Sequence, residues 1–323
     1  MINDQQNNKY KYGDNQPGNN SVSYKDYPQF QEIKKKLPLR VLSEDDFKHW
    51  QTYGYVVIKN AISKEYAKQT ADFLWEFSEM SQDDKSTWKP NKTVYRMQEL
   101  NGSGMLECYH HPLLWNNRQN QRVYDAFVDI WDREDLWVTI DRANLSLPIK
   151  YNQKNFSGFL HWDADSTLKP LPVNVQGVLA LSDTTLSSGG FQCVPELFKN
   201  FSEWEQQQPA DRDPFTPNIE TVPYPAKPIL VNAGDLIIFN AMLLHGIRPN
   251  TSDDEVRLAQ YISMTPAEPA NQAIKDWRVK SFEEKTAPDG FAFEGDPREW
   301  EKNKYPPAKL NSLGEKLLGL KNY

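Results

Sequence analysis

The sequence predicts an α+β fold that is mainly β, with helices packed on one face of a β-sandwich. The first 135 residues carry helix start signals and apolar residues at helical spacing, whereas apolar runs with strand character follow them. Helices that precede strands favour separate layers over the alternating order of α/β proteins. A chain of 323 residues is long enough for one large β-rich domain or for two small ones.

The first helices are preceded by a segment of low complexity. Residues 1–38 are rich in Asn, Gln, Lys and Tyr and show no periodicity, so we expect an arm that is either mobile or strapped over the domain. Ser43 with Asp46 forms a capping box that starts a helix, and Ser63 starts a second one. A third helix is expected over residues 120–135.

Strand signals dominate the rest of the chain. Residues 196–204 predict a linker helix, and the Pro-rich stretch 209–228 is long for a structureless loop, a property that is common in lids. A break near Asn240 divides one of the apolar runs into a pair of strands. The expected strands lie at 136–140, 141–146, 173–181, 236–244 and 256–264.

The composition argues against several classes of function. A net charge of −7 disfavours a nucleic-acid partner, which would need a basic face. Cys108 and Cys193 are too few for a disulfide framework. The sequence shows no signal peptide and no stretch near the ~20 apolar residues of a membrane span. We therefore expect a cytoplasmic protein with a small-molecule ligand and no membrane partner.

The segment His161-Trp162-Asp163, together with the distant His245, is the strongest functional signal. Side chains alternate along a strand, so His161 and Asp163 lie on the same side of it. Two imidazoles and one carboxylate are the ligand set of a mononuclear iron(II) oxygenase, and they leave coordination positions open for a co-substrate and O2. His245 comes at the end of the run 236–244, where a histidine is either a satisfied core residue or a ligand.

Arg257 bears on which function the triad serves. It lies between apolar neighbours on the strand 256–264. If this strand runs antiparallel beside the strand of His245, its guanidinium can point into the metal cavity; otherwise Arg257 is a surface or rim residue. A guanidinium can grip a carboxylate by two parallel hydrogen bonds and so anchor a small dicarboxylate. The alternative function, a non-catalytic metal-binding cupin-like β-sandwich protein, needs no such anchor.

The order of these motifs resembles the phytanoyl-CoA dioxygenase (PhyH-like) family of Fe(II)- and 2-oxoglutarate-dependent dioxygenases. The likeness begins with residues 42–58, which look like the family's opening helix and first strand. It continues through the glycine turn of 188–195, the stretch 234–246 and the C-terminal tail 310–319. The resemblance covers roughly residues 39–323, which we take as a single PhyH-like domain.

The resemblance implies a double-stranded β-helix (jelly-roll, cupin-like) core with flanking helices. It implies that the catalytic residues His161, Asp163 and His245 bind Fe(2+) and that Arg257 binds the far carboxylate of the co-substrate 2-oxoglutarate. The implied reaction uses O2 to hydroxylate a small-molecule substrate and releases succinate and CO2. Asp163 is a carboxylate and not the small residue of the halogenating relatives, so the resemblance favours hydroxylation over halogenation.

Two positions depart from the family pattern. Many relatives carry a tryptophan near Val178 and a small hydroxyl residue where this chain has Ile247, and both often touch the co-substrate. The resemblance therefore leaves the details of the co-substrate pocket open while it keeps the Arg257 anchor.

Three amides in predicted strands are weaker candidates. Asn144 could reach 2-oxoglutarate from the strand 141–146. Gln176 and Gln192 each need a partner, because an unpaired buried amide costs about 1–3 kcal/mol, and that partner is either the substrate or the backbone.

The run Cys108-Tyr109-His110-His111 is a weak candidate for a second metal site, since adjacent side chains of a strand point to opposite sides. One of its histidines is expected to line the mouth of the active site instead. Trp162, between two ligands, must face away from the metal and is expected in the core. The prime substrate, the choice between hydroxylation, desaturation, epoxidation and cyclisation, and the oligomeric state stay open.

Overall fold

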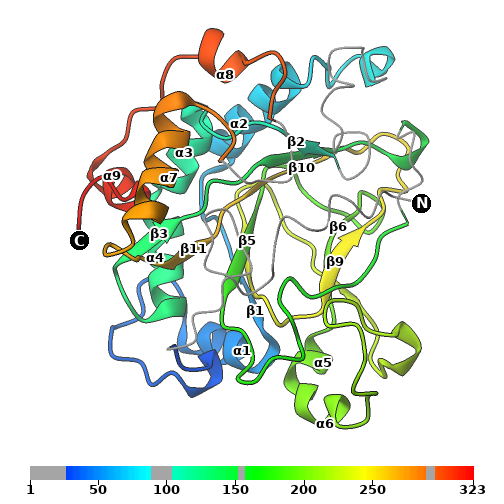
Figure 1. Cartoon of the computed structure of the whole chain (residues 1–323). Coiled ribbons are helices and arrows are strands. Elements are labelled where there is room, and N and C mark those ends of the chain that lie inside the picture. Colours follow the sequence, from blue (N-terminus) through cyan, green and yellow to red (C-terminus); the bar gives the residue numbers. More distant parts are fainter. Residues whose placement is uncertain (1–26, 89–103, 152–156, 289–294) are drawn as a thin grey trace.

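A computed structural model describes residues 27–88, 104–151, 157–288 and 295–323. Its centre is a six-stranded antiparallel sheet, with a smaller sheet on one side and most of the helices on the other (Figure 1). The fold is α+β with a double-stranded β-helix core, as the sequence predicts.

The order of the strands in the large sheet differs from their order in the chain. The sheet runs β1-β8-β5-β10-β4-β2, so most of its pairings join segments far apart in sequence. The smaller sheet has the order β7-β6-β9, and β11 pairs with β3 in a separate ribbon. The strands are β1 (Tyr55–Ile58), β2 (Met105–Leu106), β3 (Leu136–Val138), β4 (Ala143–Ser146), β5 (Val175–Ala180), β6 (Gly190–Cys193), β7 (Lys227–Pro228), β8 (Leu236–Asn240), β9 (His245–Arg248), β10 (Arg257–Tyr261) and β11 (Met264–Pro266).

Alternate residues of the large sheet face two different layers. On β5, Val175 and Leu179 belong to the core that the helices cover, whereas Val178 and Ala180 belong to the core between the two sheets. The same division separates Leu236, Ile238 and Leu258 from Ile237, Phe239 and Ala259. Residues of the second set face the smaller sheet, and so can line a site between the sheets.

The first two helices begin where their caps predict. Ser43 accepts a hydrogen bond from the backbone of Asp46, and the Asp46 carboxylate accepts one from the backbone of Ser43, which starts α1 (Glu44–Tyr53). Ser63 caps α2 (Lys64–Phe77) with its side chain.

The third predicted helix is α4 (Gln121–Trp131), which ends where Asp132 takes a left-handed conformation with φ 54°. Before it lies α3 (Pro112–Arg118), which the sequence analysis missed although a proline opens it. The predicted linker helix is in fact two short helices, α5 (Pro195–Lys199) and α6 (Phe201–Glu205). The remaining helices are α7 (Gln272–Glu284), α8 (Trp300–Asn303) and α9 (Ser312–Leu318), with 3-10 turns η1 (Phe30–Glu32), η2 (Lys85–Trp88), η4 (Ile149–Tyr151) and η5 (Ile219–Thr221).

Residues 27–38 of the predicted arm are strapped along α1 and α4. Phe30 is 1% exposed, and its ring packs edge-on against Trp50 and Trp131 at centroid distances of 5.2 and 4.9 Å. The Asp132 carboxylate accepts two backbone hydrogen bonds from this segment, at 2.8 and 2.9 Å. The rest of the predicted arm lies outside the described residues.

The stretch 209–228 is attached to the chain beside the His-x-Asp motif. The carbonyl of Phe215 accepts a hydrogen bond from the backbone N–H of Trp162 at 2.8 Å. The carbonyl of Pro214 accepts one from Ser166 at 3.0 Å. Whether this stretch also acts as a lid stays a prediction.

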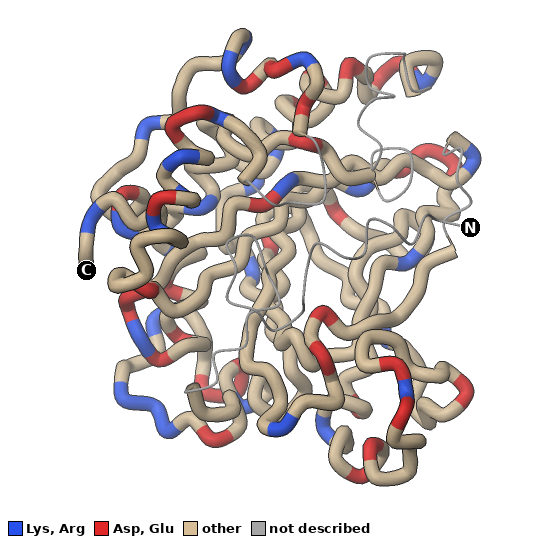
Figure 2. Tube along the Cα trace, in the orientation of Figure 1, with Lys and Arg blue, Asp and Glu red and all other residues tan. Residues whose placement is uncertain are grey.

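Charged residues of both signs are interspersed over the described trace (Figure 2). Among the helices that the structure describes, none is long and apolar enough to cross a bilayer.

Candidate metal and co-substrate site

Backbone pairing brings His161 and His245 together. The N–H of His161 donates to the carbonyl of His245 at 2.8 Å, and the N–H of His245 donates back at 3.0 Å. The two imidazole rings lie 4.7 Å apart between centroids. The two histidines are thus distant in sequence but adjacent in space, and His245, which follows the apolar run, is the first residue of β9.

Asp163 completes a compact cluster with the two histidines. Its Oδ1 lies 3.3 Å from His161 Nε2, and its Oδ2 lies 3.0 Å from His245 Nε2. One ligand atom from each of the three residues fits within 4.8 Å of the others. Burial alone would raise the pKa of the Asp163 carboxyl, but the adjacent imidazoles of His245 and His161 hold it well below its usual range. The cluster thus offers an ionised carboxylate and two ring nitrogens to one point in space.

The ring of His245 is oriented by the backbone and by aromatic neighbours. Its Nδ1 lies 2.8 Å from the carbonyl oxygen of Leu243, which places a ring proton on Nδ1 and turns Nε2 toward Asp163. Phe239 and Phe191 pack against the ring at centroid distances of 4.5 and 5.6 Å. The sequence analysis missed these three supports, although the apolar run before His245 was the signal of a buried ring.

Gly246 allows the two histidine-bearing segments to approach. A Cβ atom at this position would come within 1.9 Å of the carbonyl oxygen of Phe159, so any larger residue would force the segments apart. The glycine beside His245 is therefore needed for the pairing of His245 with His161.

Arg257 reaches the space between the sheets from the opposite side. Its strand β10 lies in the large sheet between β5 and β4, so it does not neighbour the strand of His245, and Arg257 is nevertheless buried and is not the surface or rim residue of the alternative. Arg257 and Ala259 are two residues apart on β10, so their side chains lie on the same face of the sheet, and Ala259 belongs to the inter-sheet core. A Cβ atom at Gly190 would lie 3.7 Å from Arg257 Cδ, so the glycine leaves room for the arginine side chain.

The Arg257 guanidinium is buried beside neutral partners. The residue is 3% exposed, and its Nη2 donates to Asn144 Oδ1 at 3.1 Å, with the Tyr261 hydroxyl at 3.5 Å. Among the described residues it forms no ion pair with an Asp or Glu. The structure thus brings Asn144 together with Arg257, and it adds Tyr261, which the sequence analysis did not consider.

The spacing between Arg257 and the cluster can be derived from the small sheet. Gly190, which adjoins Arg257, pairs with Arg248, and Arg248 lies three residues beyond His245 on β9. Three residues of a strand span about 10 Å. This is the order of length of a five-carbon dicarboxylate plus one metal–oxygen bond.

Residues 50–259 match the sequence model of the phytanoyl-CoA dioxygenase (PhyH) family, a span of more than half of the chain. The chain belongs to this family. "Ava biosynthesis cluster protein O" of Aspergillus versicolor is 24% identical to this PhyH chain over 251 residues, which cover 71% of the chain and 80% of the relative. A Dictyostelium discoideum protein named as a phytanoyl-CoA dioxygenase is 23% identical over 320 residues, 85% of this chain and 86% of its own.

Among solved structures, the PhyH chain is similar to the GlcNAc-inducible gene 2 product of Candida albicans. The TM-score is 0.61 at 14% identity, over 85% of this chain and 76% of that one. At this identity the likeness concerns the fold alone. Membership of the PhyH family makes the function one of the dioxygenase type, and the protein an oxidoreductase.

The two glutamines that the sequence analysis selected in the PhyH chain differ in whether they face the triad. Gln176 lies on the same face of β5 as Val178, which is the face toward the smaller sheet. Its Nε2 donates to Asp163 Oδ2 at 2.5 Å. Gln192 pairs with Gly246, whereas the flanking Cys193 pairs with His245, so Gln192 faces away from the triad. The structure does not bring Gln192 to the site, which corrects its selection as a candidate.

The positions that depart from the family pattern face the site in different strands. Val178 lies on the inter-sheet face of β5 and pairs with Tyr261 of β10, so an aromatic ring is supplied there by the neighbouring strand. Ile247 is two residues from His245 on β9, so the two side chains lie on the same face of this strand. Trp162 is 1% exposed and packs against Trp204 and Phe201, in the core as expected.

The histidines of the Cys108–His111 run have structural roles. His110 Nε2 lies 3.0 Å from Ser281 Oγ, and burial lowers the pKa of this histidine to about 3. His111 caps α3 and stacks on Phe73 at 3.7 Å, and burial lowers its pKa to about 4. Neither histidine is part of the metal cluster, so the expectation that one lines the mouth of the site is not met.

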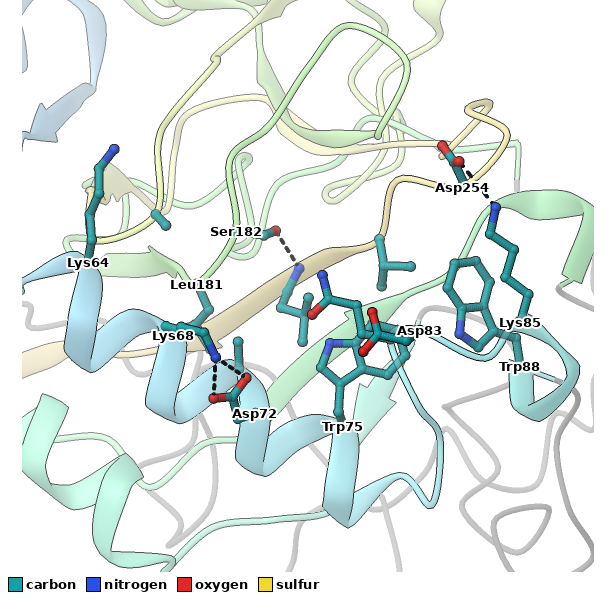
Figure 3. Close-up of a pocket in the computed structure, with 15 residues that line it drawn as sticks. Lys64, Lys68, Asp72, Trp75, Asp83, Lys85, Trp88, Leu181, Ser182 and Asp254 are labelled. Atoms are coloured by element: carbon teal, nitrogen blue, oxygen red, sulfur yellow. Dashed lines mark hydrogen bonds and ion pairs between the residues drawn. The ribbon is translucent and has the colours of Figure 1, made fainter.

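A separate pocket of about 420 Å³ lies where α2 meets the helix-covered face of the large sheet (Figure 3). Trp75 and Leu181 form part of its lining, and two of its lysines are already paired, Lys68 with Asp72 and Lys85 with Asp254. This pocket is on the opposite side of the sheet from the triad.

Proposed function

We propose that this protein is an Fe(II)- and 2-oxoglutarate-dependent dioxygenase that hydroxylates a small molecule with O2 and releases succinate and CO2. The observation that carries the proposal is the buried Arg257, which has no acidic partner among the described residues and faces the same inter-sheet space as the triad. Burying an unpaired charge costs several kcal/mol, so such a residue calls for an anionic ligand.

The triad fits a metal ion of this kind. Two neutral imidazole nitrogens and a carboxylate cannot satisfy one another without an added proton or cation, and a divalent cation at their centre satisfies all three. In our proposal His161, Asp163 and His245 would hold Fe(2+). The bound metal with 2-oxoglutarate supplies the oxidising chemistry.

The residues of the chain would bind and orient the reactants. Arg257 would grip the far carboxylate of 2-oxoglutarate by two parallel hydrogen bonds, and Asn144 would hold the guanidinium plane through its Oδ1. The carbonyl of Leu243 would keep the proton of His245 on Nδ1. Val178, Ile237 and Ala259 make the inter-sheet space apolar, which excludes water.

A non-catalytic metal-binding protein of the same fold would retain the triad. It would have no use for a buried guanidinium about 10 Å away along the strand direction. The Arg257 arrangement therefore favours the enzyme over this alternative.

The test is anaerobic reconstitution with iron(II) and 2-oxoglutarate, followed by addition of oxygen and quantification of succinate. We expect a visible charge-transfer band without oxygen, and succinate after oxygen is added, both lost in His161→Ala. A metabolite library added to the assay identifies compounds that accelerate succinate formation. If wild-type protein gives neither band nor succinate with any addition, the proposal fails and the metal-binding alternative replaces it.

We further infer that residues 39–323 form one domain. A single core contains both Leu42 near its start and Leu318 near its end. The cytoplasmic location remains a prediction.

A further inference from the structure

We propose that Arg212 is a positioning residue for the metal site, which holds the segment of His161 and Asp163 from the side that faces away from His245. This inference rests on the proposed function, because it concerns the residues that would hold the metal. It also gives the beginning of the stretch 209–228 a fixed structural task beside the triad.

The segment that carries His161 and Asp163 is not part of a regular strand. His161 forms an isolated bridge with His245, and residues 162–168 belong to no helix or strand. A single bridge holds the backbone at His161 but not at Asp163. The carboxylate therefore needs a further support if it is to keep its place beside the two imidazoles.

The backbone of residues 214–215 provides part of this support. The Trp162 N–H donates to the carbonyl of Phe215, and Ser166 donates to the carbonyl of Pro214 through its N–H at 3.0 Å and its Oγ at 2.6 Å. The backbone groups of successive residues in an extended chain point to opposite sides. The bond from Trp162 therefore lies on the other side of the segment from the His161–His245 bridge.

The side chain of Arg212 ties the two segments together. Its Nη1 donates to Ser166 Oγ at 2.6 Å, and its Nη2 donates to the Ser166 carbonyl at 2.7 Å. The Nη2 also lies 3.3 Å from Glu205 Oε1 at the end of α6. Since the Arg212 side chain is only 9% exposed, solvent screens these contacts little. Ser166, which receives two of them, is three residues after Asp163.

The guanidinium of Arg212 also packs against the residue between the two ligands. Its carbon lies 5.6 Å from the ring centroid of Trp162, 5.4 Å from that of Trp204 and 6.0 Å from that of Phe201. Trp204 and Phe201 belong to α6, which lies below the smaller sheet in the view of Figure 1.

The orientation of Trp162 depends on these ring contacts. Its side chain is buried, and its indole N–H has no hydrogen-bond partner among the residues that the structure describes. Because Trp162 lies directly between His161 and Asp163, a shift of its backbone would move one ligand relative to the other. An arginine suits the position, since its planar fork can bond Ser166 twice while its face remains on the aromatic rings.

The test uses Arg212→Met, which keeps an apolar stem and removes the guanidinium, with Arg298→Met as matched control. The Arg298 side chain is 7% exposed, pairs with Asp296, and lies 3.8 Å from the ring centroid of Trp300 and 4.7 Å from that of Phe77. Phe77 belongs to the core on the helix-covered side of the large sheet, away from the triad. The control thus loses a similar buried cation that is not attached to the metal site.

Cobalt(II) serves as the probe, because its visible absorption reports the number and arrangement of its ligands. We measure its dissociation constant and spectrum in the full-length apo protein, with circular dichroism and urea denaturation as checks of folding. For Arg212→Met we expect a dissociation constant raised about 10-fold, the lower end of the range found when a support of a metal ligand is removed. We also expect a changed spectrum, because Asp163 shifts relative to His161.

Arg298→Met should lower the urea midpoint and leave both cobalt(II) measurements unchanged. If Arg212→Met does not fold, Arg212→Gln replaces it, because glutamine stays polar but takes the cation away from the rings. The same change in affinity and spectrum is expected for that variant.

The outcomes separate this inference from the proposed function. If wild-type protein binds no cobalt(II), or His161→Ala binds it equally well, the metal site itself is refuted. If wild-type protein binds cobalt(II) at the triad and the folded Arg212 variant has the same affinity and spectrum, the metal site stands and the positioning role is overturned. The positioning role is also overturned if Arg298→Met weakens cobalt(II) binding as much as Arg212→Met does.

Discussion

Replacing Arg257 should separate the stability of the fold from the affinity for the co-substrate. In Arg257→Met, 2-oxoglutarate would lose two hydrogen bonds to a charged group, each contributing about 1.5–3 kcal/mol. The sum of about 3–6 kcal/mol corresponds to a dissociation constant raised roughly 100- to 10,000-fold. The magnitude applies because Arg257 is only 3% exposed, which limits screening by solvent.

The same substitution should not destabilise the ligand-free protein. It removes a buried charge whose desolvation costs several kcal/mol. Against this gain, Asn144 Oδ1 loses its bond from Arg257, at a cost of about 1–3 kcal/mol. We therefore expect an unfolding free energy that is unchanged or higher.

The assay combines urea denaturation of the apo protein with anaerobic titration of the charge-transfer band by 2-oxoglutarate. Arg278→Met is the matched control, since Arg278 is also buried but donates to the backbone carbonyls of Leu317 and Leu318. It should lower stability and leave co-substrate affinity unchanged. Two results would refute the reasoning. One is an unfolding free energy that falls by more than about 2 kcal/mol in Arg257→Met, because removal of an unpaired buried charge should not destabilise the protein. The other is an unchanged affinity of this variant for 2-oxoglutarate.

Four other outcomes are expected. His161→Ala and Asp163→Ala should abolish succinate formation and leave the circular dichroism spectrum unchanged. Both side chains are 27% exposed and lie outside the core clusters, so the fold does not depend on them. An unfolded variant would contradict this prediction. Burial lowers the pKa of His110 from 6.5 to about 3. Between these two values His110 is protonated in the unfolded chain but not in the folded protein, so a fall in pH favours unfolding. Stability should fall by about 2 kcal/mol between pH 7 and pH 5 from this group, and denaturation of His110→Gln at both values should show a smaller fall. Asp129→Ala should cost at least about 3 kcal/mol in urea denaturation, because the Asp129 carboxylate accepts three backbone N–H groups of residues 40–42. Zinc, nickel or copper should inhibit turnover, with activity restored by chelation and fresh iron, and activity unaffected by these metals would argue against the ligand set.

Local features of this fold could be predicted from the sequence because their causes are local. The caps Ser43 and Ser63 start α1 and α2 through bonds to residues three positions away. The break at Asn240 is also local, since its Oδ1 accepts the N–H of Met242 and turns the chain between β8 and β9. The side-chain parity of the His161 motif follows from strand geometry alone.

Features that depend on pairing between distant segments could not be predicted in this way. Arg257 and His245 lie in different sheets, and nothing in their local sequence indicates which strands become neighbours. Gln176 and Gln192 are similar amides in similar strands, and only the register places one on Asp163 and the other outside. His110 and His111 were misplaced because their burial by α7 and α2 is tertiary.

The two-faced β5 strand also limits how this protein can change. Removing or adding one residue within it would turn every following side chain to the other face. Leu179 would then enter the site and Ala180 would leave a gap beneath the helices. The strand can therefore accept substitutions, through which substrate preference can be redesigned, but it cannot change length. Insertions and deletions are confined to the loops on either side of it.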